Sequence, residues 1–142
     1  MESREIKFRL RDQQNNIVGY EKWYAGVWNL TDSYWVDPPK WLYSIKRVGW
    51  SADPIPHRRK DEYTGLKDKA GKEIYEGDIC TDPDCQQPYV VKWFEAIYDD
   101  NGSYYAGWNV GIPVGGIEKS SYGPTVIGNK YETPELMEAE DV

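Results

Sequence analysis

The sequence lacks any apolar run of about eighteen residues, the length at which a membrane-spanning helix is expected. It also lacks the pattern of a secretory signal peptide, because its first residues, MESREIKF, are charged and already alternate between polar and apolar. With only Cys80 and Cys85, it has no disulfide framework of the kind that small secreted domains use. These shortages predict a cytoplasmic protein without a membrane segment.

Histidine is scarce as well, which limits metal and triad chemistry. The only histidine, His57, lies in a Pro-rich segment that we expect to be a loop, where a catalytic side chain is poorly preorganised. Cys80 and Cys85 enclose Asp82-Pro83-Asp84, but zinc needs about four ligands and no second Cys/His pair is present. We therefore interpret CTDPDC as a turn with reduced thiols rather than a metal site.

Other signatures of catalysis and cofactor binding are also missing. Asp99-Asp100-Asn101-Gly102 lacks the alternating oxygen ligands and the distant Glu of a calcium loop, so we interpret it as a hairpin turn. The later glycines have no phosphate-binding spacing, and in so acidic a chain the choice of one carboxylate pair as acid and base would be arbitrary. We predict no catalytic residues, no cofactor and no metal, and hence a non-enzymatic protein.

Tryptophan and tyrosine, by contrast, are abundant. Seven Trp and twelve Tyr against two Phe give an aromatic share of 15%. Because each ring buries about 150–250 Å², a few rings can build a core although hydrophobic residues make up only 39% of the chain. Rings with a polar atom are also the type favoured at half-wet contact surfaces.

Charge is divided along the chain. Residues 1–60 carry eleven Lys/Arg against seven Asp/Glu, whereas residues 61–142 carry six against seventeen. The net charge of −7 disfavours nucleic acid and anionic lipid as partners, although a basic face in the first half remains open. The division could also support head-to-tail self-association, since opposite charges attract across an interface.

Alternating residues predict the strands of the first half. In residues 4–12 we expect Ile6, Phe8 and Leu10 to face the core and Lys7, Arg9 and Arg11 to face solvent. A turn at residues 15–16 and a returning strand over 17–24 should follow. Residues 41–50 are strand-like, and residues 51–60, with two prolines, are expected to form a loop.

Turn chemistry organises the second half. Asp68-Lys69-Ala70-Gly71 predicts a type I turn with a bulge, and Gly77-Asp78 predicts a corner before a strand. We expect strands over residues 89–98, 104–110 and 125–129, and a short helix with Thr133 as N-cap and Pro134 at its first helical position. The predicted structural turn positions are Gly65, Gly71, Gly77, Asp78, Gly102 and Gly128. Leu66, Ile74, Tyr75 and Ile79 are the predicted core of this half.

Short strands at regular intervals favour a mainly β fold, a small barrel or curled antiparallel sheet with an N-terminal β-hairpin region and a short C-terminal helix. At 142 residues the chain has the length of one domain. We expect a β-rich, aromatic-rich region over residues 1–60 and a barrel region with an acidic tail over residues 61–142, together forming one compact unit.

Three segments carry a resemblance to a known family: REIKFRLRD, YTGLKDKAGKEIYEGDI (residues 63–79) and TVIGNKYETPELM. In order and approximate spacing they resemble the YopX-like proteins, which are encoded mainly by bacteriophages and prophages. The resemblance implies an SH3-like barrel in the later part and a bacterial host cell. It implies no activity and transfers no site residue. The chain departs from the pattern over residues 13–62, at Cys80 and at Lys130.

These observations lead to three functional hypotheses. The first is a phage or prophage accessory protein that acts by protein–protein contacts, including self-association into a homo-oligomer. The second is a nucleic-acid-binding small barrel, in which cations and stackable rings of the first half would hold a single strand; the third is an enzyme with an unrecognised site. The candidate interaction surface consists of Trp41, Tyr43, Trp50, His57, Arg58, Arg59 and Lys60.

Overall fold

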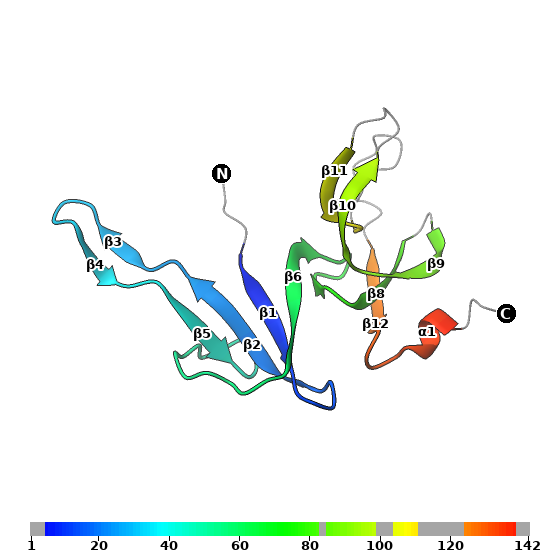
Figure 1. Cartoon of the computed structure of the whole chain (residues 1–142), viewed down its shortest axis with the longest axis horizontal. Helices are drawn as coiled ribbons and strands as arrows, with labels where there is room; N and C mark the ends of the chain where they lie inside the picture. Colours follow the sequence, from blue (N-terminus) through cyan, green and yellow to red (C-terminus); the bar gives the residue numbers. More distant parts are fainter. Residues whose placement is uncertain (1–4, 83–84, 99–103, 111–123, 139–142) are drawn as a thin grey trace. The chain divides into compact units, whose positions relative to one another are not determined.

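Short β-strands dominate the chain, as the sequence predicts. The computed structural model describes residues 5–82, 85–98, 104–110 and 124–138 (Figure 1). The chain divides into two compact units, residues 1–63 and residues 64–142, which are called unit 1 and unit 2 below. The mainly β class and the short C-terminal helix, α1 (Glu135–Glu138), are confirmed.

Unit 1 is built on an antiparallel sheet. Its strands, in spatial order, are β5 (Lys40–Ser44), β2 (Ile17–Tyr24), β1 (Lys7–Arg11) and the first part of β6 (Arg59–Lys67), after which the order continues with β7 of unit 2. The predicted second strand has the bounds of β2. The turn before it forms as predicted, because Asn15 adopts a φ of 66° and Asp12 Oδ1 accepts hydrogen bonds from two backbone N–H groups.

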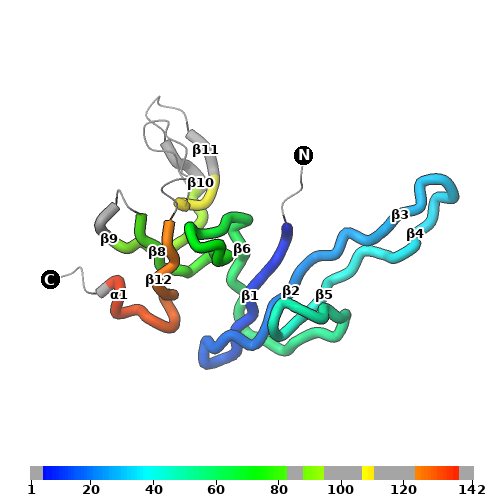
Figure 2. The backbone as a smooth tube through the Cα atoms, turned by 180° about the vertical axis from the view of Figure 1, so that it is seen from behind, coloured from blue at the N-terminus to red at the C-terminus, as the bar shows by residue number. Residues whose placement is uncertain are grey.

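A separate hairpin interrupts the path from β2 to β5. It consists of β3 (Val27–Asn29) and β4 (Tyr34–Asp37), which pair antiparallel with each other. The ribbon and tube views both show this hairpin projecting beyond the ends of β2 and β5 (Figures 1 and 2). Sequence reasoning missed both strands.

The predicted inside and outside of β1 are wrong in part. Leu10 is buried as expected, but Ile6 is 47% exposed, and all three cations of the other face are buried: Lys7, Arg9 and Arg11. The alternation of residue types shows that the two faces of β1 differ. It does not show which neighbouring strand supplies the negative charge that allows the cationic face to be buried. Here the buried Asp61 of β6 stands opposite Arg9 and neutralises the cationic face.

Asp61 organises that charged face. Its Oδ2 accepts hydrogen bonds from Arg9 Nε at 2.8 Å and from Arg11 Nε at 2.7 Å. Lys7 Nζ lies 4.8 Å from the centre of the Tyr63 ring, within the range of a cation–π contact. Burial of these charges is possible because each is paired or placed over a ring.

Unit 2 contains β7 (Glu73–Tyr75), β8 (Asp78–Asp82), β9 (Cys85–Val90), β10 (Trp93–Tyr98), β11 (Tyr104–Trp108) and β12 (Thr125–Asn129). Strands β12, β8 and β9 form one sheet in that order, and β10 and β11 form a hairpin. Among the described residues no sheet of either unit closes into a barrel. The bounds of β12 agree with the prediction.

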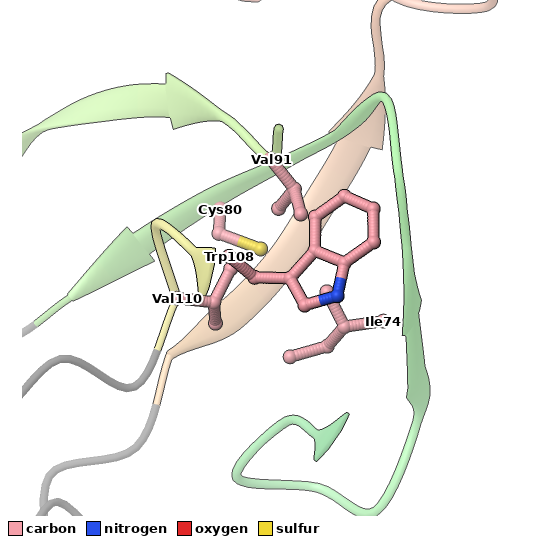
Figure 3. Packing of buried hydrophobic residues seen from close by; sticks show 5 residues of the cluster. All are labelled: Ile74, Cys80, Val91, Trp108 and Val110. Carbon is pink, nitrogen blue, oxygen red and sulfur yellow. The ribbon is translucent and has the colours of Figure 1, made fainter. Parts of the chain in front are cut away.

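The core of unit 2 is a small cluster around one ring. Figure 3 shows the indole of Trp108 among Ile74, Cys80, Val91 and Val110. Tyr75 and Ile79 are also buried, as predicted, whereas Leu66 is exposed, contrary to the prediction.

Turns of the central segment fix the strands around this core. Gly65, Gly71 and Gly77 all have positive φ, and Gly71 N donates to Asp68 O at 2.9 Å. At the second corner, Asp78 Oδ2 accepts from Tyr75 N at 2.8 Å and its Oδ1 accepts from Asn129 Nδ2 at 3.1 Å. The Asp78 carboxylate therefore joins this corner to β12, which lies about fifty residues away in sequence.

Two predicted elements differ from the structure. The strand expected over residues 89–98 is two strands, because Val91 N donates to Asp78 O and Val91 O accepts from Gly77 N instead of continuing a ladder. Thr133 is not an N-cap of α1, since its hydroxyl accepts from Asn129 N and donates to Asn129 O. The predicted turn at Asn101-Gly102 lies outside the described residues.

Candidate interaction surface

The structure divides the predicted surface between two faces of the unit 1 sheet. Trp41, Tyr43 and Lys60 lie on one face, because Trp41 pairs with Trp23 and Tyr43 pairs with Glu21 in the register. This face is called the aromatic face, and its residues are Phe8, Glu21, Trp23, Trp41, Tyr43 and Lys60.

The remaining predicted residues lie elsewhere. Trp50 contacts the opposite face, where Lys22 Nζ lies 4.4 Å from its ring centre. His57 Nδ1 is 2.7 Å from Ile55 O, and Arg58 N donates to Arg11 O at 2.7 Å, so the predicted loop is tied to the sheet. Arg59 and Lys60 are not loop residues but the start of β6. The seven residues therefore do not form one patch.

Lys60 is the centre of the aromatic face. Its Nζ donates to Glu21 Oε1 at 2.7 Å and lies 5.1 Å from the Phe8 ring and 5.7 Å from the Trp41 ring. The Glu21 side chain is almost fully buried. Burial, followed by a hydrogen bond to Glu21, raises the pKa of Tyr43, so this phenol is a neutral donor at physiological pH. A buried carboxylate thus joins a cation and a phenol.

Rings extend the aromatic face toward its edge. Trp23 and Trp41 make an edge-to-face contact with ring centres 5.2 Å apart, and Phe8 lies 6.2 Å from Trp41. Both tryptophans are partly exposed. The face can offer apolar surface to a partner, while its one cation is already compensated by Glu21.

A larger exposed surface lies on the hairpin of β3 and β4 with its connection, residues 27–37, which is called the arm below. Its exposed apolar residues are Val27, Trp28, Leu30, Tyr34, Trp35 and Val36. Trp28 pairs with Trp35, and their ring centres lie 4.8 Å apart at 71°. Asn29 Oδ1 accepts from Asp32 N and so forms the turn that presents Leu30, which is 86% exposed.

Among the described residues, none covers either face of the arm. Trp28 and Trp35 share one face and are 42% and 45% exposed, while Tyr34 lies on the opposite face because successive side chains alternate, and it is exposed as well. The sequence signal that could have revealed the arm is the pair of short runs VWN and YWV, rich in residues that favour strands, on either side of the turn-favouring LTDS. A surface hairpin ordinarily buries one face, so this arrangement is unusual.

The base of the arm is held firmly. Gly26 has a φ of +81°, and a Cβ there would lie 2.6 Å from Asp37 O and 2.7 Å from Pro39 N. Lys40 Nζ donates to Asp37 Oδ1 at 3.0 Å. Hydrogen bonds from Lys40 and then from Tyr24 lower the pKa of Asp37 below its ordinary value.

A groove of about 520 Å³ lies at the other end of the unit 1 sheet, where β5 leaves it. Its apolar lining includes Ile45, Val48, Pro54 and Ile55, and Lys46 and Asp53 are its charged residues. Ser44 Oγ donates to Val48 O at 2.6 Å and closes the loop that forms one wall. Ile45 and Val48 are 70% and 71% exposed, so the lining faces solvent.

The cysteine segment offers no reactive site in the described residues. Cys80 is a free, fully buried thiol, and burial, followed by the charge of Asp78, raises its pKa to about 12. It is therefore a poor nucleophile at neutral pH. No group of three His, Cys, Asp or Glu side chains suited to a metal ion occurs in the described part of the chain. None of its helices has the length and apolar character needed to cross a membrane.

The fold and the surface define a small antiparallel β protein that carries aromatic side chains at its surface. The chain belongs to the YopX family, because the family model described as "YopX protein" matches residues 7–138. The resemblance inferred from the three sequence segments is thereby confirmed. A comparison with curated proteins found no match.

Proposed function

We propose that this protein has no catalytic activity and acts through protein–protein contacts, with the arm as its principal contact element. The observation that supports this most strongly is the exposure of Trp28, Trp35 and Tyr34 on both faces of the arm. Patches of large exposed apolar side chains mark interaction sites on soluble proteins, and Trp and Tyr are the residues that contribute most to such contacts.

Charge pairing favours a protein partner over nucleic acid. Nucleic-acid binding depends on cations that can neutralise phosphates. In unit 1, Lys60 is bound to Glu21, Lys40 to Asp37, and Arg9 and Arg11 to Asp61. These four of the eleven Lys and Arg side chains of residues 1–60 are therefore already paired with a carboxylate within unit 1.

Membership of the YopX family supports a proposal for where these contacts are made. We infer a phage or prophage accessory protein that works in the cytoplasm of the bacterial host. We also infer that unit 2 is an SH3-like barrel, a scaffold in which the glycine corners at Gly65, Gly71 and Gly77 bend short strands.

The test compares proteins captured from a host lysate by the tagged chain and by a variant carrying both Trp28→Ser and Trp35→Ser. The proposal predicts at least one protein, or the untagged chain itself, that the original captures and the variant loses more than about tenfold. The matched control is Ile127→Ser, which changes an exposed apolar residue of unit 2 and should keep the capture. If the double variant captures the same set as the original, the arm is not the contact element.

A further inference from the structure

We infer that the partner of the arm is a second copy of this chain, and that the tip of the arm binds in the groove at the far end of the partner copy's unit 1 sheet. This inference rests on the proposed function and identifies its partner. It joins the two exposed apolar features of unit 1, the arm around Leu30 and the groove beside Val48.

The arm cannot fill the groove of its own chain. The arm precedes β5, which starts at Lys40. The groove lies at the other end of β5, where it begins at Tyr43 and Ser44 and extends along the loop that follows. Strand β5 separates them by about 13 Å, and in both views the hairpin of β3 and β4 projects from the end of β5 opposite to the loop that follows it (Figures 1 and 2). Only another molecule can bring an arm to this groove.

Size supports the match. A groove of about 520 Å³ lies within the range of about 300–1,000 Å³ typical of ligand pockets, so it can hold Leu30 together with parts of its neighbours. The exposed apolar residues on both faces and at the tip of the arm offer on the order of 700 Å² in total, slightly below the roughly 800 Å² that each partner contributes to a standard interface, so the second copy must contact the arm along its length as well as at Leu30. If each copy also receives the arm of the other, the contact closes as a twofold pair and doubles this area.

Charge supports a copy of the same chain as well. The arm carries Asp32 and, at its base, Asp37, whose charge Lys40 compensates, and the groove carries one charge of each sign, Lys46 and Asp53. The arm and the groove are therefore both nearly neutral. When two identical molecules meet in this way, no strong repulsion between like charges opposes the contact. An association of this kind should persist at high salt, because it depends on apolar burial rather than ion pairs.

The experiment measures molar mass by size-exclusion chromatography with light scattering. The original chain at tens of micromolar should elute as a dimer or larger assembly in both low and high salt. Leu30→Asp, which alters the arm, and Val48→Asp, which alters the groove, should each elute as monomers. Both positions are exposed, so the variants should fold, which circular dichroism checks. Ile127→Asp is the matched control and should keep the original mass.

Mixing the two variants tests the arm-in-groove arrangement directly. A Leu30→Asp copy keeps its groove and a Val48→Asp copy keeps its arm, so an equimolar mixture should recover a one-to-one dimer that neither variant forms alone. A monomeric original chain overturns the inference, while arm-dependent capture of another protein would leave the proposed function standing. A mixture that stays monomeric while the original is a dimer also overturns it, because arms that bind other arms cannot be rescued in this way.

Discussion

At the scale of single residues, buried charge holds this protein together at several points. Asp61 binds two arginines, Glu21 binds Lys60, and Asp78 joins the corner at Tyr75 to Asn129. Each carboxylate accepts hydrogen bonds from groups far away in sequence, so each acts as a tie between strands. The acidic composition therefore has structural uses, besides giving the chain its negative net charge.

Asp68 gives a test of this role through pH. Its Oδ1 accepts from Ala70 N and Lys72 N, at 2.9 and 2.8 Å, and its Oδ2 accepts from Val126 N at 3.1 Å. Burial alone would raise the pKa of Asp68, but these N–H groups together lower it below the ordinary value. The resulting stabilisation is complete above about pH 4, the unfolded-state value, and is lost as the pH falls through the lower folded-state pKa.

Asp68→Asn should accordingly lower the free energy of unfolding at pH 7 by about 2 kcal/mol. The gap between the two proteins should narrow as the pH falls below about 4, because protonated Asp68 resembles the amide. Urea unfolding between pH 2.5 and pH 7 measures both effects, and Glu135→Gln, at an exposed position on α1, serves as the matched control. A gap that is the same at pH 3 as at pH 7 would contradict this role.

At the scale of elements, short sequence patterns predicted the strands and turns whose structure depends on neighbouring residues. Residues 17–24, as the return after a turn, and residues 125–129 were predicted as strands, which are β2 and β12 with their observed bounds, and the Asp-x-x-Gly pattern predicted the turn at residues 68–71. The burial of Arg11 could not be predicted, since it depends on Asp61, fifty residues away in sequence. The arm was missed because its runs, VWN and YWV, do not alternate as the strands of a hairpin with one covered face do.

The base of the arm gives a test at this scale. Gly26→Ala should destabilise unit 1 by about 3 kcal/mol, because the new Cβ would overlap the backbone at Asp37 and Pro39. Such a loss corresponds to a Tm lowered by about 10 °C or more. Hydrogen exchange in residues 27–37 should rise in parallel, since the arm loses its fixed base.

Gly49→Ala is the matched control for this substitution. Gly49 also has a positive φ, of +64°, but no atom lies within 4 Å of the position that a Cβ would take. Its cost is therefore backbone strain alone, about 1 kcal/mol. If Gly26→Ala melts at the same temperature as Gly49→Ala, the close approach at the base of the arm does not exist in solution.

At the scale of the whole molecule, the two units differ in what they expose. Unit 2 holds most of the central segment that marks the family, and there its residues are corners, hairpin turns and core, with Ile74 and Cys80 buried against Trp108. Unit 1 holds the arm, the aromatic face and the groove, where apolar side chains meet solvent. We therefore assign folding to the central segment and, in our proposal, recognition to unit 1.

Disulfide trapping tests the central claim most directly. Leu30→Cys and Val48→Cys are introduced together into a Cys85→Ser background, in which the buried thiol of Cys80 stays unreactive because its pKa is raised to about 12. Mild oxidation at tens of micromolar should give covalent dimers or larger assemblies on a denaturing gel, and neither single variant should do so. Monomers alone from the double variant, or equal dimer from Leu30→Cys by itself, would contradict the binding of the arm in the groove of a second copy.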